Sequence, residues 1–311
     1  MFEISSSYAD RVQFAGGSIM PRSTLSVLLV SALLLLSASA SQAQTQASCT
    51  FTFLPTMVTI PNFGTATWSA SGINDFGTVV GSASTPTADF GIIRWAGGGV
   101  TPVFGTSLVA RNDSGLSIGY SVIENNQPIL LIGTSGTDIT LNGSPGPIQA
   151  VNGINGWGSV VGTYFTDFPN GLTGFKRWSN GGFITLNFPG AQQTTPIGIN
   201  DSSTIVGSYF AVAGQGNGFI YHNGQWASLN FPSSTNTTLT GISNAGVIIG
   251  NAMVNGSSAA FLYGNGVFKV ISVPNALANS TTVFGIGPKL GMILGTASFS
   301  TGNQGFIATC Q

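Results

Sequence analysis

Short apolar runs alternate with glycine-rich polar segments over most of the chain. No stretch keeps the 3.6-residue apolar period of an amphipathic helix. The segments between the runs are rich in Asn, Asp, Gly and Pro, which form turns, and the runs themselves are short enough to be strands. The pattern therefore predicts an all-β protein.

One ten-residue pattern recurs six times, about every 43 residues. Its clearest copy is Gly72-Ile73-Asn74-Asp75-Phe76-Gly77-Thr78-Val79-Val80-Gly81. Asn and Asp side chains hydrogen-bond their own backbone and Gly tolerates left-handed φ, so each copy predicts a turn followed by a strand. The six copies end at Gly81, Gly119, Gly162, Gly207, Gly250 and Gly295. The copy ending at Gly119 is degenerate, and the last contains one extra residue.

A second and a third apolar run follow each copy, as in Gly174–Trp178 and Phe183–Pro189. Asn180-Gly181, Asn223-Gly224 and Asn265-Gly266 separate the two runs. Asn-Gly between strand-forming runs predicts a type I′ hairpin, which needs positive φ at both central residues. Six units of three or four strands predict a six-bladed β-propeller over residues 44–311.

The last unit ends at Gly305–Cys310 without a third run. Cys49–Pro55 supplies one when its final proline is aligned with that of Trp226–Pro232. In this alignment Cys310 takes the position of Asn223 and Cys49 that of Trp226. We therefore expect N- and C-terminal strands to share the last blade and a Cys49–Cys310 disulfide to replace the hairpin turn.

An apolar block, Leu25–Leu36, stands near the N-terminus. At 12 residues it is shorter than the ~20 that span a bilayer. Arg22 precedes it and Ser41-Gln42-Ala43 offers a cleavage site, so residues 1–43 are predicted to be a secretory signal peptide. The mature protein would begin at Gln44, without a membrane span, in the periplasm or outside the cell. Met20 is an alternative start, and an uncleaved anchor is the disfavoured alternative.

The repeats resemble the bacterial extracellular HAF-repeat family, in which Gly-Ile-Asn-x-x-Gly-x-Val-Val-Gly precedes His-Ala-Phe. The resemblance covers roughly residues 49–311. The histidine of that motif is replaced here, as in Thr173-Gly174-Phe175 and Asn217-Gly218-Phe219. The resemblance implies a secreted, propeller-like fold and no particular reaction.

The composition limits the partners and reactions that can be expected of this protein. Only 5% of residues are charged, and 8 Lys+Arg against 9 Asp+Glu give a net charge of −1. This balance argues against a polyanionic partner such as nucleic acid, because the recognition of phosphates needs a basic field. Two Cys and one His, His222 beside a predicted hairpin turn, exclude a zinc set and disfavour a hydrolytic triad. We therefore expect no metal, no cofactor and no catalytic residue.

The acidic and aromatic residues leave three functions open. We expect Asp75, Asp113 and Asp201 to form turns, whereas convergence of the remaining acids at one channel mouth would favour a polysaccharide hydrolase or lyase. These acids are Asp89, Glu124, Asp138 and Asp167. Trp95, Trp178 and Tyr221 fall at equivalent strand ends, which indicates packing between blades.

Three aromatic residues are the candidate ligand contacts. Trp157 lies in a predicted turn, and Tyr164 and Tyr209 both follow a final motif glycine by two positions. The leading hypothesis is a secreted, monomeric, non-catalytic module that binds a glycan, a cell-wall polymer or a protein. A structural surface or matrix component is the third alternative.

Overall fold

The computed structural model describes residues 11–13, 19–21, 44–166, 171–211, 215–289 and 291–310. The chain divides into two units, Met1–Gln42 and Ala43–Gln311. In the first unit β1 (Arg11–Gln13) pairs with β2 (Ile19–Pro21) in antiparallel fashion. The predicted apolar block and cleavage site lie outside the described residues, as do Asp167 and Met20's side chain, so the signal peptide stays a prediction.

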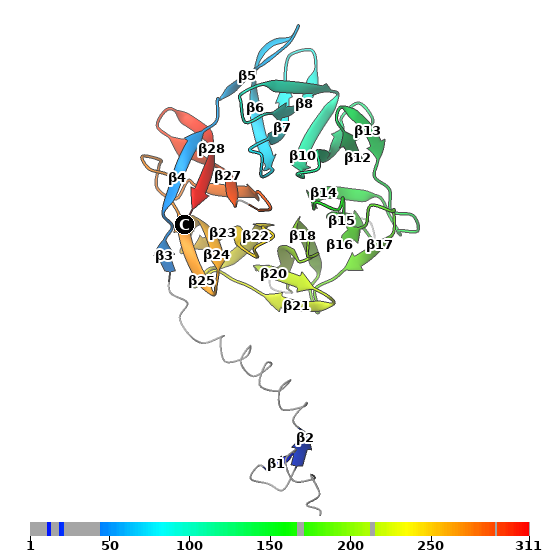
Figure 1. The fold of residues 1–311 in the computed structure, drawn as a ribbon, viewed down its shortest axis with the longest axis vertical. Coiled ribbons are helices and arrows are strands. Elements are labelled where there is room, and N and C mark those ends of the chain that lie inside the picture. Colours follow the sequence, from blue (N-terminus) through cyan, green and yellow to red (C-terminus); the bar gives the residue numbers. More distant parts are fainter. Residues whose placement is uncertain are drawn as a thin grey trace, which may run out of the picture. The chain divides into compact units, whose positions relative to one another are not determined.

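Six β-sheets surround a central axis in the second unit, as the sequence predicts (Figure 1). Blade 1 contains β5 (Met57–Ile60), β6 (Gly64–Ile73), β7 (Val79–Ser84), β8 (Asp89–Arg94) and β9 (Val100–Phe104). Blade 2 contains β10 (Thr106–Arg111), β11 (Leu116–Ser121), β12 (Gln127–Ile132) and β13 (Ser135–Asp138). Blade 3 contains β14 (Ile148–Ile154), β15 (Val160–Phe165), β16 (Leu172–Arg177) and β17 (Phe183–Leu186).

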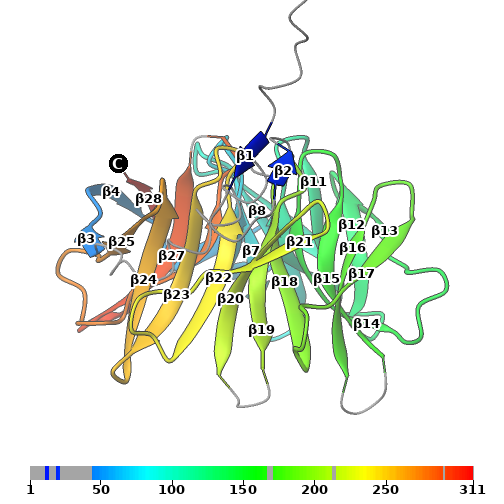
Figure 2. The same ribbon diagram turned by 90° about the horizontal axis from the view of Figure 1, so that it is seen from below.

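The second half of the ring repeats this meander. Blade 4 contains β18 (Gln193–Ile199), β19 (Ile205–Phe210), β20 (Gly216–His222) and β21 (Gln225–Ser228). Blade 5 contains β22 (Asn236–Ile242), β23 (Ile248–Val254), β24 (Ser257–Gly264), β25 (Val267–Ile271) and β3 (Gln44–Gln46). Blade 6 contains β26 (Thr282–Ile286), β27 (Met292–Phe299), β28 (Gly302–Cys310) and β4 (Cys49–Phe53). Seen from the side, the strands run between two faces of the ring (Figure 2).

The two chain ends close blade 6. The C-terminal strand β28 pairs with the N-terminal strand β4, and Cys310 lies opposite Cys49, to which it is disulfide-bonded. This confirms the predicted closure, but the predicted register is wrong. Phe306 pairs with Phe53 as Phe219 pairs with Ser228, so Cys49 matches Gly224 and not Trp226. The alignment on the prolines was misleading because Pro55 follows the end of β4 by two residues, whereas Pro232 follows the end of β21 by four.

Two strands were not expected from the repeat. Residues 44–46 form β3, which adds to the outer edge of blade 5 in parallel with β25. Strand β5 forms a hairpin with the first half of β6, whose second half pairs with β7. The N-terminal part of the second unit therefore contacts blades 5, 6 and 1 in turn.

The Asn-Gly hairpins differ among blades. Asn223 and Asn265 have φ of 48° and 52°, and the following glycines also have positive φ, which confirms type I′ turns there. At Asn180-Gly181 only the glycine has positive φ. The loop there is longer, because the Trp178 N–H donates to the carbonyl of Gly182 and the Gly181 N–H donates to the carbonyl of Trp178. The prediction of a type I′ turn is wrong at that site, where Gly182 adds a residue.

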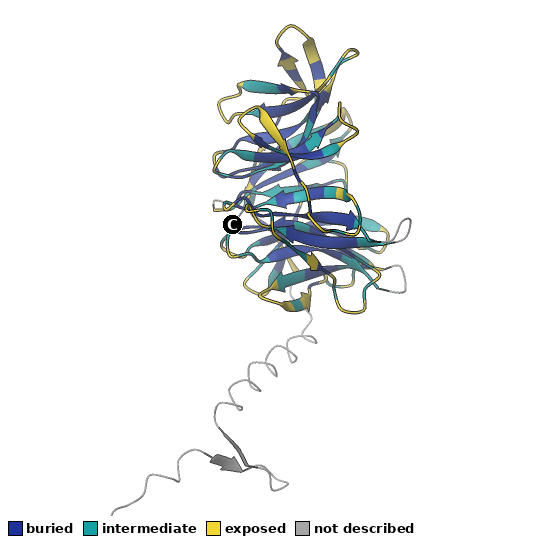
Figure 3. Cartoon of the chain, turned by 90° about the vertical axis from the view of Figure 1, so that its right-hand side faces the viewer, coloured by how far each residue is buried: buried dark blue, intermediate teal, exposed yellow. Residues whose placement is uncertain are grey.

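Blades pack face to face over phenylalanines on their third strands. Phe175, Phe219, Phe261 and Phe306 are fully buried at equivalent positions opposite the final motif glycines. Burial is concentrated on the strands, whereas the loops are exposed (Figure 3). In the part of the chain that the structure describes, no helix has the length and apolarity needed to cross a membrane.

Candidate ligand-binding face

One face of the propeller carries the turns that follow the six inner strands. We call it the Asx face and define it by the first turn residues, which are Asn74, Asn112, Asn155, Asn200, Ser243 and Gly287. In a four-stranded meander the turn after the third strand lies at the same end as the turn after the first. The hairpins after β8, β12, β16, β20 and β24 therefore lie on the Asx face as well.

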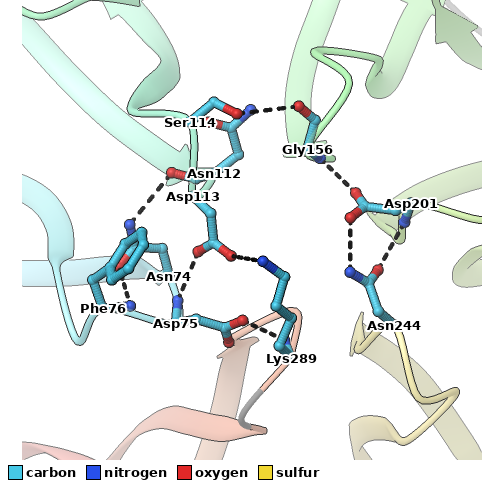
Figure 4. A network of polar contacts seen from close by, with 10 residues as sticks. All are labelled: Asn74, Asp75, Phe76, Asn112, Asp113, Ser114, Gly156, Asp201, Asn244 and Lys289. Atoms are coloured by element: carbon cyan, nitrogen blue, oxygen red, sulfur yellow. Dashed lines mark hydrogen bonds and ion pairs between the residues drawn. The ribbon is translucent and has the colours of Figure 1, made fainter.

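The turn asparagines join neighbouring blades. Asn74 Nδ2 donates to the Asn112 carbonyl at 3.3 Å (Figure 4). Asn112 Nδ2 donates in turn to the Asn155 carbonyl at 2.8 Å. The next two links run from Asn155 Nδ2 to the Asn200 carbonyl and from Asn200 Nδ2 to the Ser243 carbonyl, both at 3.1 Å. All four asparagines are buried. Hydrogen bonds thus connect blades 1 to 5 around the axis.

The same asparagines stabilise their own turns. Asn155 Oδ1 accepts the N–H groups of Trp157 and Ser159 at 3.2 and 2.9 Å. Asn74 Oδ1 accepts those of Phe76 and Thr78 in the same way. The amide of Asn supplies both the acceptor used within the turn and the donor to the next blade, which explains why Asn occupies this position in four copies, three of them after Gly-Ile.

The acidic turn residues are held by backbone donors. Asp113 Oδ1 accepts the Asp75 N–H at 3.0 Å, and Asp201 Oδ1 accepts the Gly156 N–H at 2.7 Å. Asp201 Oδ2 accepts Asn244 Nδ2 at 2.7 Å. These carboxylates therefore serve mainly to tie each blade to the next, in agreement with their expected role as turn residues.

Blade 6 closes this ring differently, because Gly287 replaces the asparagine. A β-carbon there would lie 2.7 Å from Asp75 Oδ1, so the carboxylate of blade 1 takes the space. The Lys289 N–H donates to Asp75 Oδ2 at 2.6 Å, and Lys289 Nζ lies 3.7 Å from Asp113 Oδ2 (Figure 4). Lys289 therefore links blade 6 with blades 1 and 2.

A cavity of about 260 Å³ lies on the axis among the inner strands. Glycines bring these strands close together. A β-carbon on Gly153 would lie 2.4 Å from the Ile197 carbonyl oxygen, and one on Gly198 would lie 2.9 Å from Gly241 Cα. The described residues contain no cluster of three metal-ligating side chains. Glycines and isoleucines of the inner strands line the cavity together with the polar residues Arg111, Asn152 and Asp201.

Exposed aromatic rings gather on blades 1 and 3 of the Asx face. Trp157 is 71% exposed and Phe76 is 66% exposed, at equivalent turn positions. Trp157 Nε1 donates to the Asp201 carbonyl at 3.1 Å, so the indole lies against the turn of blade 4. Trp95 and Trp178 are exposed at the hairpins after β8 and β16. Tyr221 does not share their position: it pairs with Ile205 as Arg177 pairs with Val160.

Two of these rings contact cations. The guanidinium of Arg111 lies 5.4 Å from the Trp95 ring, and Lys176 Nζ lies 5.2 Å from the Trp178 ring. Burial lowers the pKa of Arg111, Lys176 and Arg177 below their ordinary values. Arg111 Nη1 donates to Ser117 Oγ at 2.7 Å, but its Nε is buried without a hydrogen-bond partner.

The three predicted contact residues differ in how far they are exposed. Trp157 is accessible, as expected. Tyr164 is only 3% exposed, and its hydroxyl hydrogen-bonds Thr185 inside blade 3. Tyr209 is half-buried and stacks on Phe188 at 3.7 Å. Both tyrosines pack within blades, so of the three residues Trp157 alone presents a ring to a ligand.

No hydrogen bond or ion pair joins the other described acids to one another or to the histidine. Asp89, Glu124 and Asp138 are exposed, and their strand positions place them toward the face opposite the Asx face. His222 is exposed at a hairpin and contacts Thr204 Oγ1 and Asn223 Nδ2 at 3.0 Å. Sequence analysis did not identify the exposed ring of Phe76, and it assigned Trp95 and Trp178, which are exposed, to packing between blades.

Comparison with known proteins identifies the fold. No family model matches the chain, and no curated protein matches it in sequence. A gluconolactonase from Xanthomonas campestris is 10% identical, with a TM-score of 0.51, over 88% of this chain and 99% of its own. The fold is a β-propeller.

Two further solved structures have lower TM-scores. Virginiamycin B lyase from Staphylococcus aureus is 9% identical, with a TM-score of 0.47, over 84% of this chain and 99% of its own. A variant of the Aleuria aurantia lectin in complex with Fucα1-6GlcNAc is 12% identical, with a TM-score of 0.49, over 81% and 91%. Identities this low do not assign the propeller an activity or a ligand.

Proposed function

We propose that this propeller is a secreted, non-catalytic binding module that holds an extracellular glycan or cell-wall polymer on the Asx face. The observation that carries the proposal is the exposure of four large rings on the Asx face, Phe76 and Trp95 on blade 1 and Trp157 and Trp178 on blade 3. Large aromatic rings exposed together on a rigid scaffold are characteristic of interaction sites, because each ring offers flat apolar area at little entropic loss. We also propose that the chain belongs to the HAF-repeat family and that it is exported.

The rigidity of the scaffold supports the proposal. Trp157 lies two residues after Asn155, which is hydrogen-bonded within its own turn and to the next blade. Its indole N–H is already hydrogen-bonded, so the ring orientation is fixed before a ligand arrives. The disulfide at the chain ends is compatible with an oxidising compartment.

The acidic residues give the alternative of a hydrolase or lyase no support. Asp113 and Asp201 accept backbone or amide N–H groups, and Asp75 accepts the Lys289 N–H. Asp89 lies in blade 1 and Glu124 and Asp138 lie in blade 2, without a hydrogen bond between any two of them. A glycosidase needs two carboxyl groups that flank one bond, and no observation among the described residues favours such a pair.

Binding of the full chain to glycan arrays and to insoluble cell-wall polymers tests this function. Trp157→Ala should weaken binding about tenfold or more, since a central aromatic contact typically contributes over 1.4 kcal/mol. Phe104→Ala is the matched control, because this ring is also exposed but lies at the end of β9 on the opposite face. Equal loss in both variants, or release of soluble sugars from a bound polymer, would contradict the proposal.

A further inference from the structure

We infer that the ligand of the Asx face is an acidic polysaccharide, whose sugar rings stack on the exposed aromatics while its carboxylates bind the cations beside them. This inference rests on the proposed function and specifies its ligand. Its basis is the distribution of charge over the propeller, which the net charge of the chain conceals.

The cations lie on one side of the propeller. Arg94 and Arg177 end strands β8 and β16 at the Asx face, Lys176 precedes Arg177, and Arg111 ends inner strand β10. Lys289 lies in the turn of blade 6, and its side chain is 66% exposed. Lys269 lines a cavity of about 480 Å³ together with Lys289. These are the six Lys and Arg of the described propeller.

The acids are divided between the two faces. Asp75, Asp113 and Asp201 lie in the Asx turns, where backbone and amide donors already engage them. Asp89 begins β8, Glu124 lies in the turn between β11 and β12, and Asp138 ends β13, all away from the Asx face. In the described propeller the Asx face thus has twice as many cations as acids, and the opposite face has acids alone.

Aromatic rings and cations lie next to each other in blades 1 to 3. Arg111 lies between Trp95 of blade 1 and its own blade 2, with one buried nitrogen unpaired. In blade 3 the partly exposed Arg177 adjoins Trp178 and donates from Nη1 to its carbonyl at 3.2 Å, whereas Lys176, which contacts the Trp178 ring, is buried. A ligand on this surface meets a flat apolar ring and a positive charge in the same place, which suits a sugar ring that carries a carboxylate.

The density of positive charge favours a polysaccharide over nucleic acid. Duplex DNA carries one charge per about 1.7 Å and is bound by closely spaced Lys and Arg. A polyuronate carries one charge per sugar ring, so a surface with few cations beside aromatic rings suits its lower density of charge. The rings also discriminate against an acidic peptide, which has no flat apolar face to stack.

Polygalacturonate and its fully methyl-esterified form provide the test, because they share a backbone and differ in charge. The full chain should bind polygalacturonate at least about tenfold more tightly in low salt, and the difference should shrink as salt rises. Arg111→Gln and Lys289→Gln should each weaken binding to the acidic polymer about two- to fivefold. Glu124→Gln, which removes a charge from the opposite face, should leave binding unchanged, and thermal melting checks that each variant is folded.

Other outcomes distinguish failure of this inference from failure of the proposed function. Equal binding of both polymers, abolished by Trp157→Ala, keeps the binding face but overturns the acidic ligand. Binding to polyglutamate or to single-stranded DNA as tight as to polygalacturonate overturns the requirement for a sugar. Binding to neither polymer overturns the inference, and the glycan and cell-wall screen then decides the proposed function independently.

Discussion

Lys176 is a buried cation where the other blades carry aliphatic side chains. The equivalent residues of the other blades pair, like Lys176, with the residue just before the final motif glycine; they are Ile93, Leu130, Ile220, Leu262 and Ile307. Only 7% of Lys176 is exposed, and its ammonium contacts the Trp178 ring. Burial lowers its pKa because water no longer solvates the charge fully.

Replacement of this lysine should separate stability from binding. Lys176→Leu should raise the free energy of unfolding by about 1 kcal/mol at neutral pH, since an aliphatic chain suits the site better. It should also weaken the binding of an acidic polysaccharide. Urea unfolding and polymer binding measure the two effects, with Lys269→Gln, at a partly exposed lysine, as the control. A loss of stability would show that the contact with Trp178 outweighs burial.

The lowered pKa also predicts a pH dependence. Between the lowered pKa and the ordinary pKa of lysine, the unfolded chain binds more protons at this site than the folded chain. The contribution of Lys176 to the free energy of unfolding therefore rises with pH through that alkaline window. This part of the rise should be absent from urea titrations of the Lys176→Leu variant.

At the scale of the strand, the final motif glycine is explained by a bulge. In every blade the inner strand shifts register opposite this glycine, for example between Val151 and Gly153 opposite Gly162. A β-carbon on Gly162 would lie 2.0 Å from the Ala150 carbonyl oxygen. The bulge turns a backbone carbonyl toward the neighbouring strand, and only glycine leaves room for it.

Gly162→Ala should therefore lower the free energy of unfolding by more than about 2 kcal/mol. Gly136→Ala is the control, because this glycine lies in the outer strand β13 and the nearest atom to its β-carbon would be 3.8 Å away. Its effect should stay within about 1 kcal/mol. Similar effects of the two substitutions in urea unfolding would show that the bulge can relax.

Sequence analysis predicted the repeating elements but not all of their registers. Turn chemistry at Asn74, Asn155 and Asn200 marks the ends of inner strands, so the number of blades could be read directly. The predicted repeat position of Cys49 was wrong because a proline marks only the end of a strand, whereas the register depends on cross-strand pairing. Strand β3 could not be predicted, since three residues at an outer edge carry no pattern.

At the scale of the whole molecule, the binding face depends on how the propeller brings together charged and aromatic side chains that are distant in sequence. A net charge of −1 led us to argue against a polyanionic partner, but a sum over the chain does not show which face a residue occupies. Trp157 was identified from its place in a predicted turn, and Phe76 at the equivalent position of blade 1 carries the same signal. Trp95 and Arg111 come together only after the blades are placed around the axis.

Closure of the ring by Cys49 and Cys310 gives the last prediction. The bond joins residues 261 positions apart, so in the chain-entropy model it stabilises the fold by about 5 kcal/mol by restricting the unfolded chain. The double variant Cys49→Ser, Cys310→Ser should melt about 10 °C lower. Reductant should lower the melting temperature of the wild type to the same value and leave the variant unchanged. If the wild type melts at the same temperature with and without reductant, pairing of β28 with β4 closes the ring without help from the disulfide.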